Sequence, residues 1–261
     1  MPLTRRIHPT RYGQLHLRVS EGRGVPLVLL HPSPRSGEMW EPLQERLSRP
    51  CYAPDRLGYG FSDAPPWALS VEQYAHATLD ALMAAGVGTP FDVLGIRAGA
   101  IEAIEIAAQV PERVRRVLVV GMPLFTPDEH QRQLEKYSEQ PLKPAAEGGH
   151  VLGAWRGCFA FRSPPYDLAD VQRRFLEHVL AANPGAALKA ASGYPIEKRL
   201  KSLRAPLTVL APHDDIIEQT ARIKPLLKRE DVYVDLPDLG LDLFHEATER
   251  MAELINRHAP G

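Results

Sequence analysis

Arg97 occupies a turn whose shape favours chemistry. In FDVLGIRAGAIEAIEIAAQ, residues 91–109, an apolar run stops at Gly95 and a helical pattern starts by Ala100. Gly95 and Gly99 indicate a tight strand-to-helix turn with Arg97 at its tip. The first turn of a helix leaves N–H groups free and carries a partial positive charge, so this position already favours anions. A guanidinium there adds a fixed charge that suits two-pronged binding of a carboxylate.

Other polar side chains with chemical potential also follow apolar runs. His213, Asp214 and Asp215 come directly after VLAP. Because no second His/Asp cluster stands at metal-ligand spacing, we expect no metal site. His31 ends the run PLVLLHP and is a candidate either for substrate binding or for orienting its loop by a hydrogen bond. Ser33, between two prolines, is typical of a turn.

Strand and helix patterns alternate along most of the chain, and they must position these side chains. Strand patterns cover 13–20, 26–32, 51–55, 91–95, 114–121, 205–212 and 232–236, and helical patterns cover 39–47, 70–86, 100–109, 218–227 and 246–258. Such alternation predicts an α/β fold with a mostly parallel sheet flanked by helices. Ligands of such sheets bind beyond the carboxyl ends of the strands, so the turns there form the expected site.

A helical insertion interrupts this rhythm. Residues 122–204 show no strand pattern, break at prolines, and contain two amphipathic stretches, HVLGAWRGCFAF and DVQRRFLEHVLAAN. Its aromatic side chains are candidates for lining a substrate pocket or, equally, for packing the insertion onto the core. These residues are Trp155, Phe159, Phe161 and Tyr194.

Composition excludes several classes of protein. The formal net charge of -1 over 261 residues argues against nucleic acid as a partner, since phosphate binding needs a basic surplus. The longest apolar runs are too short to span a bilayer, and the N-terminal residues lack an apolar stretch of signal-peptide length. Cys51 and Cys158 form no metal or redox spacing. We therefore expect a cytoplasmic protein without membrane association, cofactor or metal, whose partner is a small molecule.

Five segments, in order, resemble the α/β-hydrolase superfamily over nearly the whole chain. LLHPSPRSGEMW is similar to the H-G-x-P loop of that family, APDRLGYGFSDAP to its D-x-x-G-x-G-x-S turn, and LGIRAGA to the nucleophile elbow G-x-S-x-G. VLAPHDDII resembles the loop of the triad acid, and LPDLGLDLFHEATERMAELI the segment of the triad histidine. The resemblance implies a core formed by residues 1–121 and 205–261. It also implies a helical cap, residues 122–204, inserted after the sixth strand.

The resemblance also implies a degenerate catalytic triad. Arg97 stands at the nucleophile position, Leu241 at the histidine position, and Asp215 at the acid position. An arginine stays protonated at neutral pH and cannot attack a carbonyl, and leucine cannot move a proton. The backbone N–H groups of Ser33 and Ala98 correspond to the oxyanion hole of the family.

His245 is a candidate substitute for the missing histidine. It lies four residues after Leu241, so the two share a face if the last helix begins that early. His245 would then reach towards Asp215. The alternative is a histidine in the first turn of a helix that is exposed or makes a capping contact.

Three functions remain open on this basis. The first is a non-hydrolytic enzyme of the lyase, isomerase, decarboxylase or cyclase type. In it Arg97 would anchor a small anionic or carbonyl-bearing molecule, with Asp215 or His245 handling protons. The second is an inactive protein that binds a ligand or partner, and the third is a hydrolase in which His245 and Asp215 activate water. For Arg97 itself, pairing with Asp215 and binding a ligand are compatible, whereas an unpaired arginine pointing out along the cap is disfavoured by the cost of desolvation.

Overall fold

One mostly parallel sheet forms the centre of the molecule. The computed structural model describes residues 3–88, 90–137, 143–159, 166–191 and 193–261, and in it the strands are ordered β1-β2-β4-β3-β5-β6-β7-β8. Their bounds are β1 (Leu3–Thr10), β2 (Gly13–Ser20), β3 (Leu27–Leu30), β4 (Cys51–Pro54), β5 (Phe91–Ile96), β6 (Val114–Val120), β7 (Leu207–Pro212) and β8 (Val232–Leu236). β1 pairs antiparallel with β2, and β2 with β4, while all later pairs are parallel. The predicted α/β fold is confirmed.

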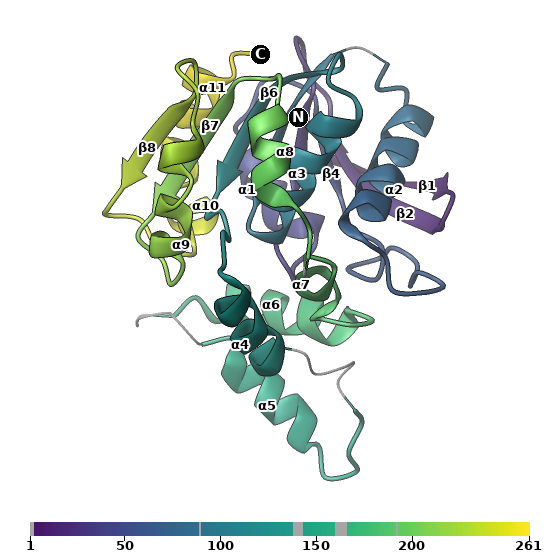
Figure 1. Ribbon diagram of the computed structural model, residues 1–261. Helices are drawn as coiled ribbons and strands as arrows, with labels where there is room; N and C mark the ends of the chain where they lie inside the picture. Colours follow the sequence, from purple (N-terminus) through teal and green to yellow (C-terminus); the bar gives the residue numbers. More distant parts are fainter. Residues whose placement is uncertain (1–2, 89, 138–142, 160–165, 192) are drawn as a thin grey trace.

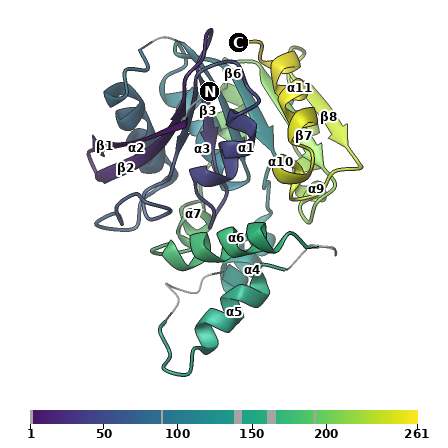
Figure 2. The same ribbon diagram turned by 180° about the vertical axis from the view of Figure 1, so that it is seen from behind.

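Helices cover both faces of the sheet. Their bounds are η1 (Gly37–Trp40), α1 (Glu41–Gln44), α2 (Val71–Ala84), α3 (Ala98–Gln109), α4 (Pro127–Tyr137), α5 (Gly149–Gly157), α6 (Leu168–Leu180), α7 (Ala186–Ala190), α8 (Ile196–Ser202), α9 (Ile217–Ala221), η2 (Lys224–Leu226), α10 (Leu243–Glu246) and α11 (Thr248–His258). Figure 1 shows α2, α3 and α8 in front of the sheet, and Figure 2 shows α1, α10 and α11 on the opposite face. Among the described residues no helix is long and apolar enough to cross a membrane.

Successive side chains of the strands pack alternately into two hydrophobic cores, one on each face of the sheet. In β3, Val28 and Leu30 join the core under α2, α3 and α8, whereas Leu27 and Leu29 join the core under α1, α10 and α11. This division follows from the pleat, which turns successive side chains to opposite faces. A continuous apolar run such as LVLL is therefore what a strand covered on both faces requires.

The edge strand β1 differs from the sequence expectation. Its eight residues pair in unbroken register with β2, from Leu3 opposite Ser20 to Thr10 opposite Gly13. The segment LTRRIHPT lacks clear alternation, because an edge strand buries few of its side chains, and Ile7 is 60% exposed. Pro9 is tolerated in this edge strand, where ladder hydrogen bonds are needed on one side only.

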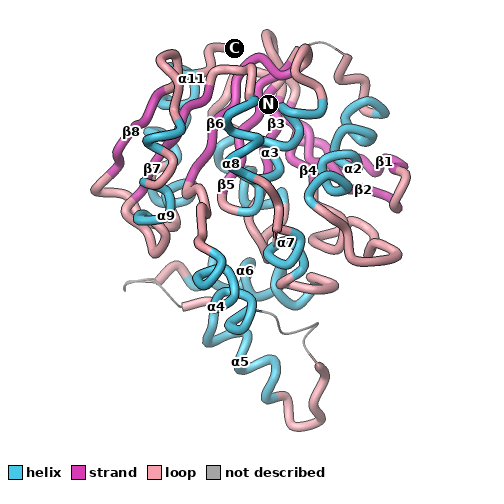
Figure 3. Tube along the Cα trace, in the orientation of Figure 1, coloured by secondary structure: helices cyan, strands magenta, loops and turns pink. Residues whose placement is uncertain are grey.

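Helices α4 to α7 lie beyond the carboxyl ends of the strands, below the sheet in Figures 1 and 3. They belong to the segment 122–204 that the sequence predicts as a cap, and we call α4–α7 the cap. Helix α8, from the same segment, lies against α3 instead, and its Leu200 is buried in the core beneath it. The chain thus returns to the sheet before the segment ends.

Candidate functional site

The turn at Arg97 keeps the backbone geometry of a sharp strand-to-helix elbow. Arg97 has φ 53° and ψ −111°, the only positive φ among the described non-glycine residues. The flanking glycines make the turn possible, because a Cβ on Gly95 would lie 2.0 Å from the Gly99 carbonyl oxygen. A Cβ on Gly99 would lie 2.1 Å from the Leu30 carbonyl oxygen. Such a backbone costs about 1–3 kcal/mol and tends to persist at functional sites.

Two carboxylates hold the Arg97 guanidinium. Its Nη2 donates to Asp214 Oδ2 at 2.8 Å and also to Asp215 Oδ1. Asp214 is itself fixed, since its other oxygen accepts the Ile216 N–H at 3.0 Å. Burial opposes the charged form, but the hydrogen bond and charge of Asp215 and the charge of Asp214 outweigh it and raise the pKa of Arg97. Arg97 is therefore a fixed cation, paired through one of its three nitrogens.

A large cavity lies between the elbow and the cap. Its volume is about 1230 Å³, and Arg97, Asp215 and Leu241 all line it. Ser33 and Ala98, the predicted oxyanion positions, line it as well. Ala98 is the first residue of α3, where a backbone N–H has no partner within the helix. Ser33 Oγ donates to the Tyr59 hydroxyl at 3.0 Å, which fixes the loop.

His245 lines the same cavity as Leu241 and Asp215, but its ring pairs with the cap. Helix α10 begins only at Leu243, so Leu241 and His245 do not share a helical face as predicted. His245 Nε2 instead pairs with Asp167 Oδ2 of the cap at 3.1 Å, and the predicted pairing with Asp215 is not observed. Asp167 is the N-cap residue of α6, and its carboxylate contacts α10 through His245.

His31 makes the loop-orienting hydrogen bonds that the sequence indicates as the alternative to substrate binding. The residue is 1% exposed, and it is not among the described residues that line the cavity. Nε2 accepts the Arg56 N–H at 2.9 Å, so Nδ1 carries the proton and donates to the Pro32 carbonyl at 2.8 Å. Burial and the positive charge of Arg56 lower its pKa to about 3. His31 therefore stays neutral and holds two loops together.

The aromatic candidates of the cap divide into two groups. Trp155 makes edge contacts with Phe159 and Phe175, so Trp155 and Phe159 pack within the cap and are not among the described lining residues. A role for either ring in substrate binding stays a prediction. Tyr194 does line the cavity, and its hydroxyl donates to Glu105 of α3. Phe161 lies outside the described residues.

His213 makes a surface contact with Asp235 at 3.0 Å. In the described part of the chain, no group of three or more His, Cys, Asp or Glu side chains is arranged to hold a metal ion. Two other histidines that the sequence did not single out line the cavity, His130 of α4 and His178 of α6. Burial lowers the pKa of each. Burial thus favours the neutral form of both rings, and only the docking of the cap brings them to the cavity.

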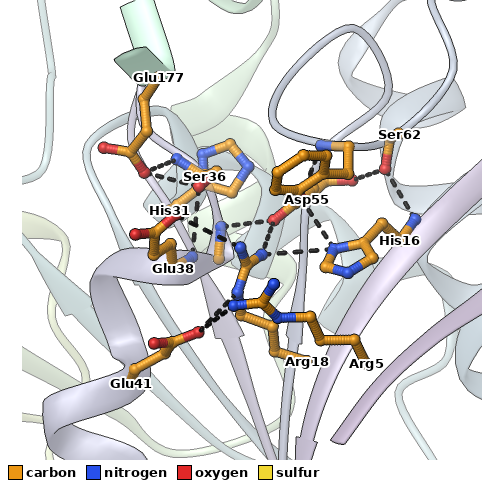
Figure 4. Close-up of polar contacts among 12 residues, drawn as sticks. Arg5, His16, Arg18, His31, Ser36, Glu38, Glu41, Asp55, Ser62 and Glu177 are labelled. Atoms are coloured by element: carbon orange, nitrogen blue, oxygen red, sulfur yellow. Dashed lines mark hydrogen bonds and ion pairs between the residues drawn. The ribbon is translucent and has the colours of Figure 1, made fainter. Parts of the chain in front are cut away.

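Asp55 organises the loops beneath the cavity. In Figure 4 its carboxylate receives hydrogen bonds from several directions. Arg18 Nη1 donates at 2.7 Å, the Gly37 N–H at 2.7 Å and the Phe61 N–H at 2.9 Å. His16 Nδ1 lies 2.9 Å from the second oxygen. One buried carboxylate therefore joins β2, the loop after β3 and the turn after β4.

Glu177 of α6 links the cap to the loop after β3, one of the segments that Asp55 joins. The N–H and Oγ of Ser36 donate to its Oε1 at 2.8 and 2.6 Å, and Arg35 Nε donates to its other oxygen. A second link joins Arg174 of α6 to Asp242 at 2.7 Å. The cap is thus held over the cavity by buried polar contacts.

We expect Glu177→Ala to lower the free energy of unfolding by about 3 kcal/mol, because it leaves Arg35 and the Ser36 N–H without their acceptor. Urea denaturation monitored by circular dichroism measures this, and limited proteolysis should show faster cleavage within the cap. Glu253→Ala, exposed on α11, is the matched control and should change neither. Equal stability of the two variants would contradict a fastening role for Glu177.

A model of the Alpha/beta hydrolase family matches residues 27–254, and the chain belongs to this family. It is similar to Pyrrolizixenacetamide deacetylase of Xenorhabdus hominickii, with 33% identity over 115 residues, or 43% of each protein, so the match spans less than half of that relative. Alpha/beta hydrolase domain-containing protein VTE7 of Arabidopsis thaliana is 23% identical over 90% of this chain and 74% of its own length.

Solved structures share the fold at lower identity. The enol-lactonase from Burkholderia xenovorans LB400 has a TM-score of 0.80 at 18% identity, covering 98% of this chain and all of that one. Carboxylesterase CesB (YbfK) from Bacillus subtilis has a TM-score of 0.79 at 19% identity, covering 100% of this chain and 93% of that one. These similarities establish the α/β-hydrolase fold.

Proposed function

We propose that this chain is a non-hydrolytic enzyme that binds a small anionic or carbonyl-bearing molecule beneath the cap, with Arg97 as its electrostatic anchor. The observation that carries the proposal is the arginine itself. It stands at the tip of the elbow, is held by Asp214 and Asp215, and lines a large cavity. A guanidinium cannot form an acyl-enzyme, so the reaction must proceed without one at this position.

Charge stabilisation is the chemistry that this site offers. A preorganised cation stabilises negative charge as it develops on an enolate or carboxylate oxygen. The first N–H of α3, at Ala98, adds a partial positive charge beside it. Lyase, isomerase, decarboxylase and cyclase reactions all need this kind of stabilisation. Asp215 and the histidines of the cavity are available to move protons.

The strained backbone at Arg97 supports a functional role for this side chain. A turn that no longer holds a nucleophile has no need of φ 53° at a residue with a side chain, and a glycine would relieve the strain. Arg97 keeps that conformation together with two aspartate partners. The proposal explains both features, because the turn aims the cation at the ligand.

A fluorophosphonate probe tests the non-hydrolytic part of this proposal. We expect the unaltered protein to remain unlabelled and to give no burst of p-nitrophenol from short p-nitrophenyl esters, because the elbow lacks a nucleophile. The double variant Arg97→Ser, Leu241→His, which restores the missing groups, is the positive control for probe access. Labelling of the unaltered protein at any serine would favour a hydrolase with displaced groups. Absence of turnover with every carbonyl substrate, combined with tight ligand binding, would favour a binding protein.

A further inference from the structure

The cavity lies beyond the carboxyl ends of the strands and is lined by segments from both sides of the sheet. The two halves of its lining differ in chemistry. Arg97 marks the boundary, because it joins a central strand to α3. Ile96, before it, packs in the core under α1 and α10, while Ala98 and Ile101, after it, belong to the side of α3. All four residues line the cavity. A ligand held by Arg97 therefore meets a different environment on each side.

The half next to α3 is uncharged. The described lining residues that come from α3, α4, α7 and α8 include no Asp, Glu, Lys or Arg. Asp215, just before α9, is the charged residue at the boundary of this half, where it pairs with Arg97. Its apolar wall is formed by Ile101, Phe125, Ala187, Leu188, Ala191 and Ile196. Among its described residues the one histidine is His130, and burial lowers the pKa of this ring, which favours its neutral form.

The other half, between α6, η1, α1 and α10, carries the charges. Glu38, Glu41 and Arg173 line it. Much of this charge is already compensated, since Arg18 Nε lies 3.0 Å from Glu41 Oε1 and Nη2 lies 3.5 Å from Glu38 Oε2. The side chain of Arg173 is 44% exposed, and its partner Asp170 lies 3.5 Å away. This half suits the polar, hydrated part of a ligand.

We infer that the substrate is amphipathic, with an apolar chain or ring system in the uncharged half and its carboxylate or carbonyl at Arg97. The inference rests on the proposed function, because it takes Arg97 as the anchor. The cavity of about 1230 Å³ exceeds the range of roughly 300–1,000 Å³ usual for small-molecule sites, so a molecule the size of acetate would leave most of it empty. An apolar moiety gains free energy in the uncharged half with no unpaired charge to desolvate there.

Binding of n-alkanoates of increasing length tests the inference. We expect the Kd, measured by calorimetry with the full chain, to fall about three- to fourfold for each methylene from butanoate to octanoate. The matching 1-alkanols should show the same dependence on length but bind more weakly, because they lack the anion. Arg97→Gln should remove the preference for the acid over the alcohol and leave the length dependence intact.

A matched pair of leucine variants locates the apolar moiety. Leu188→Gln, in the uncharged half, should flatten the length dependence while butanoate still binds. Leu176→Gln makes the same change on the outer face of α6, where Leu176 is 48% exposed, and should behave as the unaltered protein. Thermal unfolding without ligand checks that both variants are folded.

The possible failures are distinct. Alkanoates that bind with equal affinity at every length, in the unaltered protein, would overturn the amphipathic substrate and leave the anchor role of Arg97 intact. Length dependence without any preference for acid over alcohol would instead overturn the anchor role. An equal effect of the two leucine variants would place the apolar moiety outside the uncharged half.

Discussion

An Arg97→Gly variant is expected to lose about 10- to 100-fold in affinity for small carboxylates, since a hydrogen bond to a charged group contributes about 1.5–3 kcal/mol. Arg97→Ala should lose the same affinity. The two variants should differ in stability, because glycine adopts φ 53° freely whereas alanine retains the strain of a Cβ. We expect the glycine variant to be more stable than the alanine variant by about 1 kcal/mol.

Both variants should still be less stable than the unaltered protein. The side chain of Asp214 is 2% exposed, and without Arg97 this carboxylate lacks its cation. Arg97→Lys keeps a charge without the planar fork, so it should bind carboxylates with intermediate affinity. Calorimetry with octanoate and urea denaturation measure the two effects separately. Unchanged octanoate affinity in Arg97→Gly would contradict the role proposed for the arginine.

The largest loss of stability is expected from Asp55→Ala, at about 3–5 kcal/mol, as is typical when one partner of a buried ion pair is removed. Both Asp55 and Arg18 have fully buried side chains, so Arg18 would keep its charge without its nearest partner. The Gly37 and Phe61 N–H groups would also lose their acceptor. Asp63→Ala, in the same turn but exposed, removes one acceptor for the Gln14 N–H and should cost about 1 kcal/mol.

The stabilisation from Asp55 should depend on pH. Burial by itself raises the pKa of this carboxyl, but the hydrogen bond from His16, the charge of Arg18 and the Phe61 N–H outweigh it, so the pKa is lowered overall. Its contribution is therefore present above the unfolded pKa of about 3.9 and is lost as the pH falls through the lower folded value. The difference in unfolding free energy between the unaltered protein and Asp55→Asn should shrink below pH 4. A difference independent of pH would show that the charge of Asp55 is not what stabilises the loops.

Sequence alone determined the fold class and the residue types that the elbow presents. Apolar runs of four to seven residues, separated by amphipathic helices, specify a covered parallel sheet because each strand must bury both faces. Gly95 and Gly99 specify the elbow, since neither position has room for a Cβ. The residue types at Arg97 and Leu241 are likewise read from the sequence, and the proposal that no acyl-enzyme forms at this elbow rests on them.

Only the tertiary structure decided which side chains meet. The pairing of His245 with Asp167 joins residues nearly 80 positions apart through the docking of the cap, and no local pattern encodes it. The same holds for Glu177, whose partners lie in the loop after β3. An amphipathic pattern indicates that a helix has a buried side, but it does not indicate what that side packs against. His130 and His178 therefore line the cavity only because of where α4 and α6 dock. The division of the cavity into charged and uncharged halves arises likewise from the two faces of the sheet, which separate residues that the sequence interleaves.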